Sequence, residues 1–147
     1  MKKSAIVLSL LLAYHASLAA QTLDITTNKE VKTCLEKYGE NSSECLEDLN
    51  DKTEDELNQV YNKKLKAMEA FDYTQWWMGD KNRKSTMIEA FKKNQAEWLT
   101  YRNDYCNVAT TGSQGTHFLG ASSVGCNINM NKRRISEIKM IQLKNLE

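Results

Sequence analysis

The residue types best suited to catalysis are few in this chain of 147 residues, and their spacing does not assemble a reactive pair. A nucleophilic Ser or Cys needs a neighbouring base, most often His. The sequence has two histidines, His15 near the N-terminus and His117 within a stretch rich in Ser and Gly. Because His117 has no second base or free thiol near it, we expect an exposed loop residue and no enzymatic activity.

Carboxylates are concentrated between residues 44 and 56, where paired acids could cleave a glycosidic bond or bind calcium. A calcium loop needs a central Gly and a closing Glu at fixed spacing, and the run from Asp48 has neither. The acids instead recur around a helical pattern, which is typical of a solvated face. We call this set the acidic face and expect it to bind no metal or cofactor. Its candidate contacts to a protein partner are Glu47, Asp48, Asp51 and Asp55.

The four cysteines are spaced for disulfides rather than for zinc. They contain no C-x2-C pair, and His117 is the only histidine in the same part of the chain. Four cysteines allow three pairings. We favour Cys34–Cys45 and Cys106–Cys126, because adjacent helices would bring each pair together. In the chain-entropy model each closed loop stabilises the fold by about 3 kcal/mol.

Three polar residues fall on otherwise apolar helical stripes: Asn58, Gln95 and Arg102. A buried guanidinium must be paired or hydrogen-bonded. Arg102 lies one turn after Trp98, which we expect in the core, and could reach loop carbonyls or an acid of the second helix. We interpret the three as a polar network that holds the long loop described below, in preference to a ligand site.

Two adjacent tryptophans, Trp76 and Trp77, lie where one helical pattern ends and the next begins. One of them could close the end of a helical bundle. The other, if exposed, could stack on a sugar ring or contact a protein. A buried role is the more common for such a pair, and both alternatives stay open.

The N-terminus predicts export. Lys2 and Lys3 precede a short apolar run, and small residues end the segment at Ala19 or Ala20. This is the pattern of a secretory signal peptide over residues 1–20, and the apolar run is well short of the ~20 residues of a spanning helix. The even cysteine count agrees with export. We expect a periplasmic or secreted bacterial protein with no membrane span after signal removal.

The charge excludes one class of partner. The whole chain has 20 Lys and Arg and 19 Asp and Glu. Residues 1–20 contain Lys2, Lys3 and no acid, so the remainder has 18 basic and 19 acidic residues and a net charge of −1. Nonspecific nucleic-acid binding depends on a large positive field. We therefore expect no nucleic-acid partner.

The elements that must position these residues are all helical. Apolar residues recur at three- and four-residue steps and predict helices over 29–38, 43–71, 80–106 and 126–146. Residues 21–28 have no period and predict a flexible lead-in, and residues 107–125 predict a long Gly- and Ser-rich loop. The prediction is an all-α fold: a single domain over 29–147, a small antiparallel bundle of two long and two shorter helices, joined by disulfides.

The same residues carry a resemblance to a known family. The chain has Leu57-Asn58-x-x-Tyr61-x-x-x-Leu65, then Gln95-x-x-Trp98-x-x-x-Arg102-Asn103-x-x-Cys106, then Gly112-Ser113, Cys126 and Arg134. This order resembles the N-terminal domain of the small exported bacterial proteins named for the lysozyme inhibitor LprI. The resemblance implies a disulfide-bonded helical domain outside the cytoplasm and suggests lysozyme inhibition. The family usually has Asp where this chain has Asn103, which puts an ion pair at that position in doubt.

Two functions remain open at this stage. The first is inhibition of a lysozyme or a related peptidoglycan-cleaving enzyme. Lysozymes are usually cationic with a deep acidic cleft, so the acidic face would steer association and the 107–125 loop would insert. The second is a periplasmic immunity or envelope-partner module that sequesters an exported toxin without affecting lysozyme.

Overall fold

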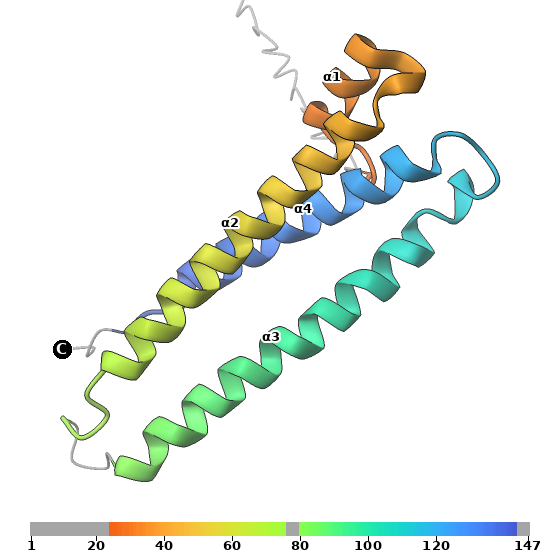
Figure 1. The fold of residues 1–147 in the computed structure, drawn as a ribbon. Coiled ribbons are helices and arrows are strands. Elements are labelled where there is room, and N and C mark those ends of the chain that lie inside the picture. Colours follow the sequence, from red (N-terminus) through yellow and green to blue (C-terminus); the bar gives the residue numbers. More distant parts are fainter. Residues whose placement is uncertain (1–23, 76–79, 144–147) are drawn as a thin grey trace, which may run out of the picture.

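The computed structural model describes residues 24–75 and 80–143, and in these ranges the regular structure is helical. A short helix comes first and three long helices follow it, and two short 3-10 turns lie between helices (Figure 1). They are α1 (Lys29–Tyr38), η1 (Gly39–Asn41), α2 (Ser43–Ala70), α3 (Lys81–Ala109), η2 (Thr111–Ser113) and α4 (Leu119–Met140). The prediction of an all-α helical bundle is confirmed, although α4, with 22 residues, belongs with the long helices.

The long helices run up, down and up along one axis. Asn50 and Thr53 of α2 meet Asn127 and Asn131 of α4, so these two helices are parallel. The α3 helix lies antiparallel to both, and α1 packs across the end where α2 and α4 begin (Figure 1).

Two apolar clusters hold these helices together, and α4 contributes to both. The larger lies between α2, α3 and α4 and includes Leu57, Met68, Phe91, Trp98, Met130 and Ile138. The smaller joins α1 to the starts of α2 and α4 through Val31, Leu46, Ala121 and Ile128. Because α4 is shared, its small and apolar residues fix the positions of the other three helices.

The start of α4 corrects the prediction of a long loop. The α3 helix continues to Ala109 and α4 begins at Leu119, so the connection spans only residues 110–118. Gly120 and Gly125 look like loop residues in the sequence, yet both are helical. Burial of Ala121 and Gly125 against neighbouring segments outweighs the weak helix propensity of the two glycines. At its other end α4 stops at Met140, and the remainder of the predicted 126–146 helix is partly outside the described residues.

The lead-in is also more ordered than predicted. Asn129 of α4 donates from Nδ2 to the carbonyl oxygens of Ile25 and Thr27, at 2.8 and 2.9 Å. Asn28 caps α1 by accepting from the backbone N–H groups of Glu30 and Val31, and donates to Asn129 Oδ1 at 2.9 Å. Residues 24–28 are therefore held on α4, and the expectation of a flexible lead-in is wrong for them.

Gly125 makes this contact possible, and it carries a testable prediction. A Cβ atom there would lie 2.1 Å from the Thr26 carbonyl oxygen. We expect Gly125→Ala to displace the lead-in and lower the free energy of unfolding by about 1–2 kcal/mol in a urea titration. Gly120→Ala is the matched control, because a Cβ there meets nothing within 4 Å. That variant should be up to ~1 kcal/mol more stable. A loss of stability in both variants would contradict the steric explanation.

Candidate protein-binding surface

Both disulfides lie near the end of the bundle where α2 and α4 begin. Cys34–Cys45 joins α1 to α2, and Cys106–Cys126 joins α3 to α4, with Cα–Cα distances of 5.9 and 5.7 Å. The predicted pairing is thus confirmed. Each bond fixes the helices on either side of one turn, and we call this part of the molecule the disulfide-linked end.

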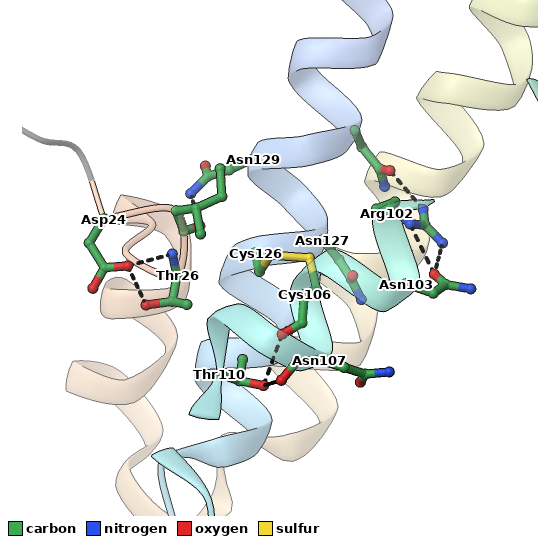
Figure 2. The surroundings of a disulfide bond; sticks show 12 residues. Asp24, Thr26, Arg102, Asn103, Cys106, Asn107, Thr110, Cys126, Asn127 and Asn129 are labelled. Carbon is green, nitrogen blue, oxygen red and sulfur yellow. Dashed lines mark hydrogen bonds between the residues drawn. A yellow bond between two sulfur atoms is a disulfide. The ribbon is translucent and has the colours of Figure 1, made fainter. Parts of the chain in front are cut away.

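The turn between α3 and α4 is anchored beside the second disulfide. The buried Thr110 donates from Oγ1 to the Cys106 carbonyl oxygen at 2.9 Å (Figure 2). Ser113 and Ser122 hydroxyls lie 2.9 Å apart and join the turn to α4. A short turn held at both sides can present side chains to a partner at low entropic cost.

Two aromatic rings are exposed at the end of this turn. His117 lies on the surface, as predicted, and its ring centroid is 3.9 Å from that of Phe118. Phe118 keeps 51% of its surface exposed. Together with Leu35, Gly39, Glu40 and Ser42 these rings line a groove between the α1–α2 and α3–α4 turns. The groove offers an apolar contact area with a polar rim.

The acidic face lies on the first half of α2, the helix whose N-cap residue Ser42 lines this groove. All four candidate contacts, Glu47, Asp48, Asp51 and Asp55, are exposed. Lys52 is the only basic residue among residues 44–56, so the field there is negative. The structure therefore brings the acidic face and the exposed turn to the same end of the molecule.

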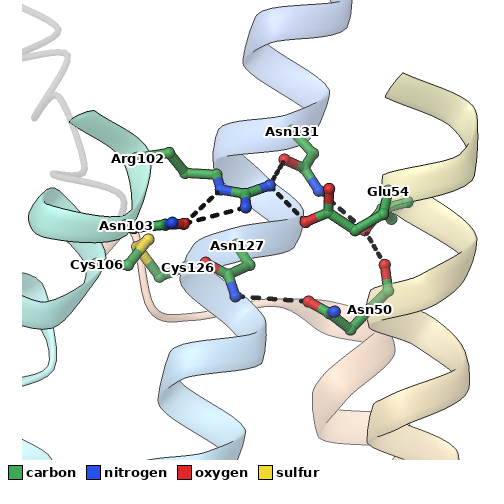
Figure 3. A network of polar contacts seen from close by, with 9 residues as sticks. Asn50, Glu54, Arg102, Asn103, Cys106, Cys126, Asn127 and Asn131 are labelled. Atoms are coloured by element: carbon green, nitrogen blue, oxygen red, sulfur yellow. Dashed lines mark hydrogen bonds and ion pairs between the residues drawn. A yellow bond between two sulfur atoms is a disulfide. The ribbon is translucent and has the colours of Figure 1, made fainter. Parts of the chain in front are cut away.

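The polar network centred on Arg102 is structural, and its members differ from the prediction. Arg102 forms a salt bridge from Nη1 with Glu54 of α2, and the same atom donates to Asn131 Oδ1 of α4 at 2.7 Å (Figure 3). Its Nε and Nη2 donate to Asn103 Oδ1 at 3.3 and 3.1 Å. The network joins α3 to α2 and α4 rather than holding the α3–α4 turn. The amide of Asn103 thus accepts the two hydrogen bonds at the position where an acid was considered.

The other two predicted members lie elsewhere. Asn58 is exposed, because it follows the fully buried Leu57 and is rotated about 100° away from the core. Gln95 is buried but accepts a hydrogen bond from Arg134 Nε at 2.9 Å, in a second network. Trp98 is buried as expected, with the guanidinium carbons of Arg102 and Arg134 at 5.6 and 5.5 Å from its ring centre.

Sequence reasoning missed Asn131 and Arg134 as members of these networks, and it anticipated Glu54 only as an unspecified acid of the second helix. Asn131 is fully buried and its Nδ2 donates to Thr53 Oγ1 at 3.3 Å. A signal for it exists, because Asn131 lies three residues after Ile128 and four before Ile135, on the apolar stripe of α4. Trp76 and Trp77 lie outside the described residues, so the choice between a buried and an exposed role stays open.

Titration behaviour points to local structure rather than to acid–base chemistry. Hydrogen bonds from Thr26 lower the pKa of Asp24, and those from Thr74 lower the pKa of Asp72. Burial raises the pKa of Tyr61 and of Tyr73. The two carboxylates fix turns, Tyr61 stacks on Phe91 of α3, and Tyr73 contacts the ring of Phe71. Among the residues the structure describes, no group of three His, Cys, Asp or Glu side chains is placed to hold a metal ion.

The fold and this surface define a class: a small, all-helical, disulfide-bonded protein whose exposed acids and one anchored turn share an end. The chain belongs to the LprI family, because the family model described as "Lysozyme inhibitor LprI" matches residues 34–138. The description of this family is that of an inhibitor, which indicates a protein-binding role at that level. Family and disulfides together indicate a location outside the cytoplasm.

A search of curated proteins found no match, and a search of solved structures found none either. Across residues 24–75 and 80–143, none of the helices has the length and apolar character that a membrane crossing requires.

Proposed function

We propose that this protein inhibits a lysozyme or a related peptidoglycan-cleaving hydrolase by binding it with the disulfide-linked end. The observation that carries the proposal is that, in a member of this family, the acidic face and the anchored turn with His117 and Phe118 share the disulfide-linked end. An acidic surface suits a cationic hydrolase, and an exposed aromatic ring suits the cleft of an enzyme that binds sugars.

Charge acts locally in this proposal. Without residues 1–20 the chain has a net charge of −1, so the molecule as a whole attracts a cationic enzyme only weakly. At physiological salt the screening length is about 8 Å, so a partner responds to the nearest charges. The acidic face is then the part that a cationic hydrolase meets first, and it lies at the same end of the molecule as the anchored turn.

A lysis assay tests the proposal. The oxidised chain without residues 1–20 is titrated against several lysozyme classes, with dissolution of cell wall as the measurement. We expect saturating inhibition of at least one class near a one-to-one ratio. Phe118→Ser should weaken that inhibition by at least about tenfold, as truncation of a central aromatic contact does. Tyr101→Ser is the matched control, because Tyr101 on α3 is 52% exposed and lies outside the groove.

The alternative is an immunity or envelope-partner module that binds a basic exported toxin through the same acidic face. Its supporting observation is the charge of that face, which does not discriminate between cationic partners. Absence of inhibition for every lysozyme class would contradict the first proposal. The alternative would then be tested by capture of partners from the cell envelope, with the acidic face intact and with its charges reversed.

A further inference from the structure

The charges of this protein are separated along the long axis of the bundle. Between residues 40 and 56 the sequence has eight Asp and Glu against one Lys. Between residues 63 and 93 it has eight Lys and Arg against four Asp and Glu. Because α2 carries the first set in its first half and part of the second set in its last turns, the two sets lie at opposite ends of the molecule (Figure 1).

Contacts between helices place the basic residues at a common level. Lys64 of α2 donates from Nζ to the Ile141 carbonyl oxygen, just past the end of α4, at 2.6 Å. Tyr61 of α2 stacks on Phe91 of α3 with ring centroids 5.0 Å apart. The basic end, as we call it, therefore combines side chains of three helices. Its exposed members are Lys63, Lys66, Arg83, Lys92, Lys93 and Lys139.

Exposed apolar side chains lie among these basic residues. Met140 follows Lys139 at the end of α4 and keeps 68% of its surface exposed. Met87 of α3, between Arg83 and Lys92 in the sequence, is 36% exposed. A soluble polyanion gains little from methionine side chains, whereas the headgroup region of a bilayer accepts both flexible apolar chains and lysines.

We infer that the basic end binds the surface of a bilayer that contains anionic phospholipids. Each Lys or Arg close to such a surface contributes about 1 kcal/mol to binding. Six exposed basic side chains, partly offset by the exposed acids Glu69, Asp72, Asp80 and Glu89 and by the salt bridge of Lys93 with Glu97 at 3.7 Å, are enough for reversible association. The inference concerns peripheral contact by side chains, and it goes beyond the proposed inhibition without depending on it.

Screening allows the two ends to act independently. From Asp51 to Lys66 there are fifteen residues of α2, or about 22 Å of helix. The nearest members of the two sets along α2, Glu56 and Lys63, are seven residues or about 10 Å apart, which still exceeds the screening length of about 8 Å at physiological salt. The acids therefore weaken attraction at the basic end without cancelling it. A molecule bound in this way directs its disulfide-linked end away from the bilayer, toward the space in which a cationic hydrolase would arrive.

Vesicle binding tests the inference. The oxidised chain without residues 1–20 is sedimented with vesicles of phosphatidylglycerol and phosphatidylcholine in equal parts, and with vesicles of phosphatidylcholine alone. We expect binding to the anionic vesicles only, although the protein itself has a net charge of −1, and loss of binding at high salt. The variant Lys63→Glu/Lys66→Glu/Lys92→Glu should bind at least about a hundredfold more weakly.

A matched variant separates position from net charge. Lys29→Glu/Lys32→Glu/Lys37→Glu changes three exposed lysines of α1, at the other end, and lowers the net charge by the same amount. It should stay within about fivefold of the unaltered protein, since its changes lie several screening lengths from the basic end. Equal losses in both variants, or no binding of the unaltered protein, would overturn the inference. Binding to soluble heparin without binding to vesicles would overturn it too, in favour of a soluble polyanion. Inhibition in the lysis assay is scored separately, so each proposal fails on its own result.

Discussion

Arg102→Ala is expected to lower the free energy of unfolding by about 3 kcal/mol, measured by chemical denaturation of the oxidised protein. The side chains of Arg102 and Glu54 are 9% and 27% exposed, so their salt bridge is largely shielded from water. Loss of the guanidinium leaves Glu54 without its cation and removes a donor to the fully buried Asn131. Most of the expected loss of stability therefore comes from Glu54 and Asn131, which are left without their charged partner. This loss exceeds the net stabilisation that the salt bridge itself provides.

A control on the neighbouring helix tests this explanation. Arg133 of α4 forms a salt bridge with Glu137 at 3.3 Å, but its side chain is 69% exposed. Arg133→Ala should change stability by less than about 0.5 kcal/mol, as is usual for exposed pairs on a helix. A double-mutant cycle of Arg102→Ala with Glu54→Gln then isolates the coupling. Similar small losses for Arg102 and Arg133 would contradict a buried network that joins three helices.

Helix ends that are set by residues next to them in the chain could be predicted from the sequence. The α1 helix spans 29–38 as predicted, since Asn28 caps its start and Gly39, with φ of 54°, ends it. Asp80 caps α3 by accepting from the Asn82 backbone N–H, so the helix begins beside the first residue of the predicted range 80–106. These residues act within one helical turn of their own position. Their effect can therefore be inferred without knowledge of the rest of the fold.

Features that depend on distant segments were the ones predicted poorly. Gly125 lies in α4 against residues 24–28, about a hundred residues earlier in the chain, and this packing is not visible in the local sequence. The partners of Arg102 are Glu54 and Asn131, one on each neighbouring helix, and only the first was considered. Asn58 was misplaced because a shift of one residue moves a side chain about 100° around a helix. For the candidate surface, the acids were evident in the sequence. That they share one end of the molecule with Phe118 follows from the parallel arrangement of α2 and α4, which the sequence does not show.

Reversal of the acidic face is expected to slow association with an inhibited hydrolase by about a hundredfold at low ionic strength. The variant replaces Glu47, Asp48, Asp51 and Asp55 with Lys, all of them exposed on the first half of α2. Fixed charges near a binding site attract an oppositely charged partner during the encounter, so they act mainly on the association rate. Stopped-flow mixing with the lysozyme class identified in the lysis assay measures that rate. The difference from the unaltered protein should shrink as salt is raised.

The control makes the same change of net charge elsewhere. Reversal of Glu69, Asp72, Glu89 and Glu97 also replaces four exposed acids with Lys, but at positions outside the acidic face. If steering is local, this variant should associate within about threefold of the unaltered protein, because its charges lie beyond the screening length from the partner. Equal slowing in both variants would show that net charge alone governs the encounter. An unchanged rate after reversal of the acidic face would remove that face from the mechanism and leave the turn with Phe118 as the surface that binds.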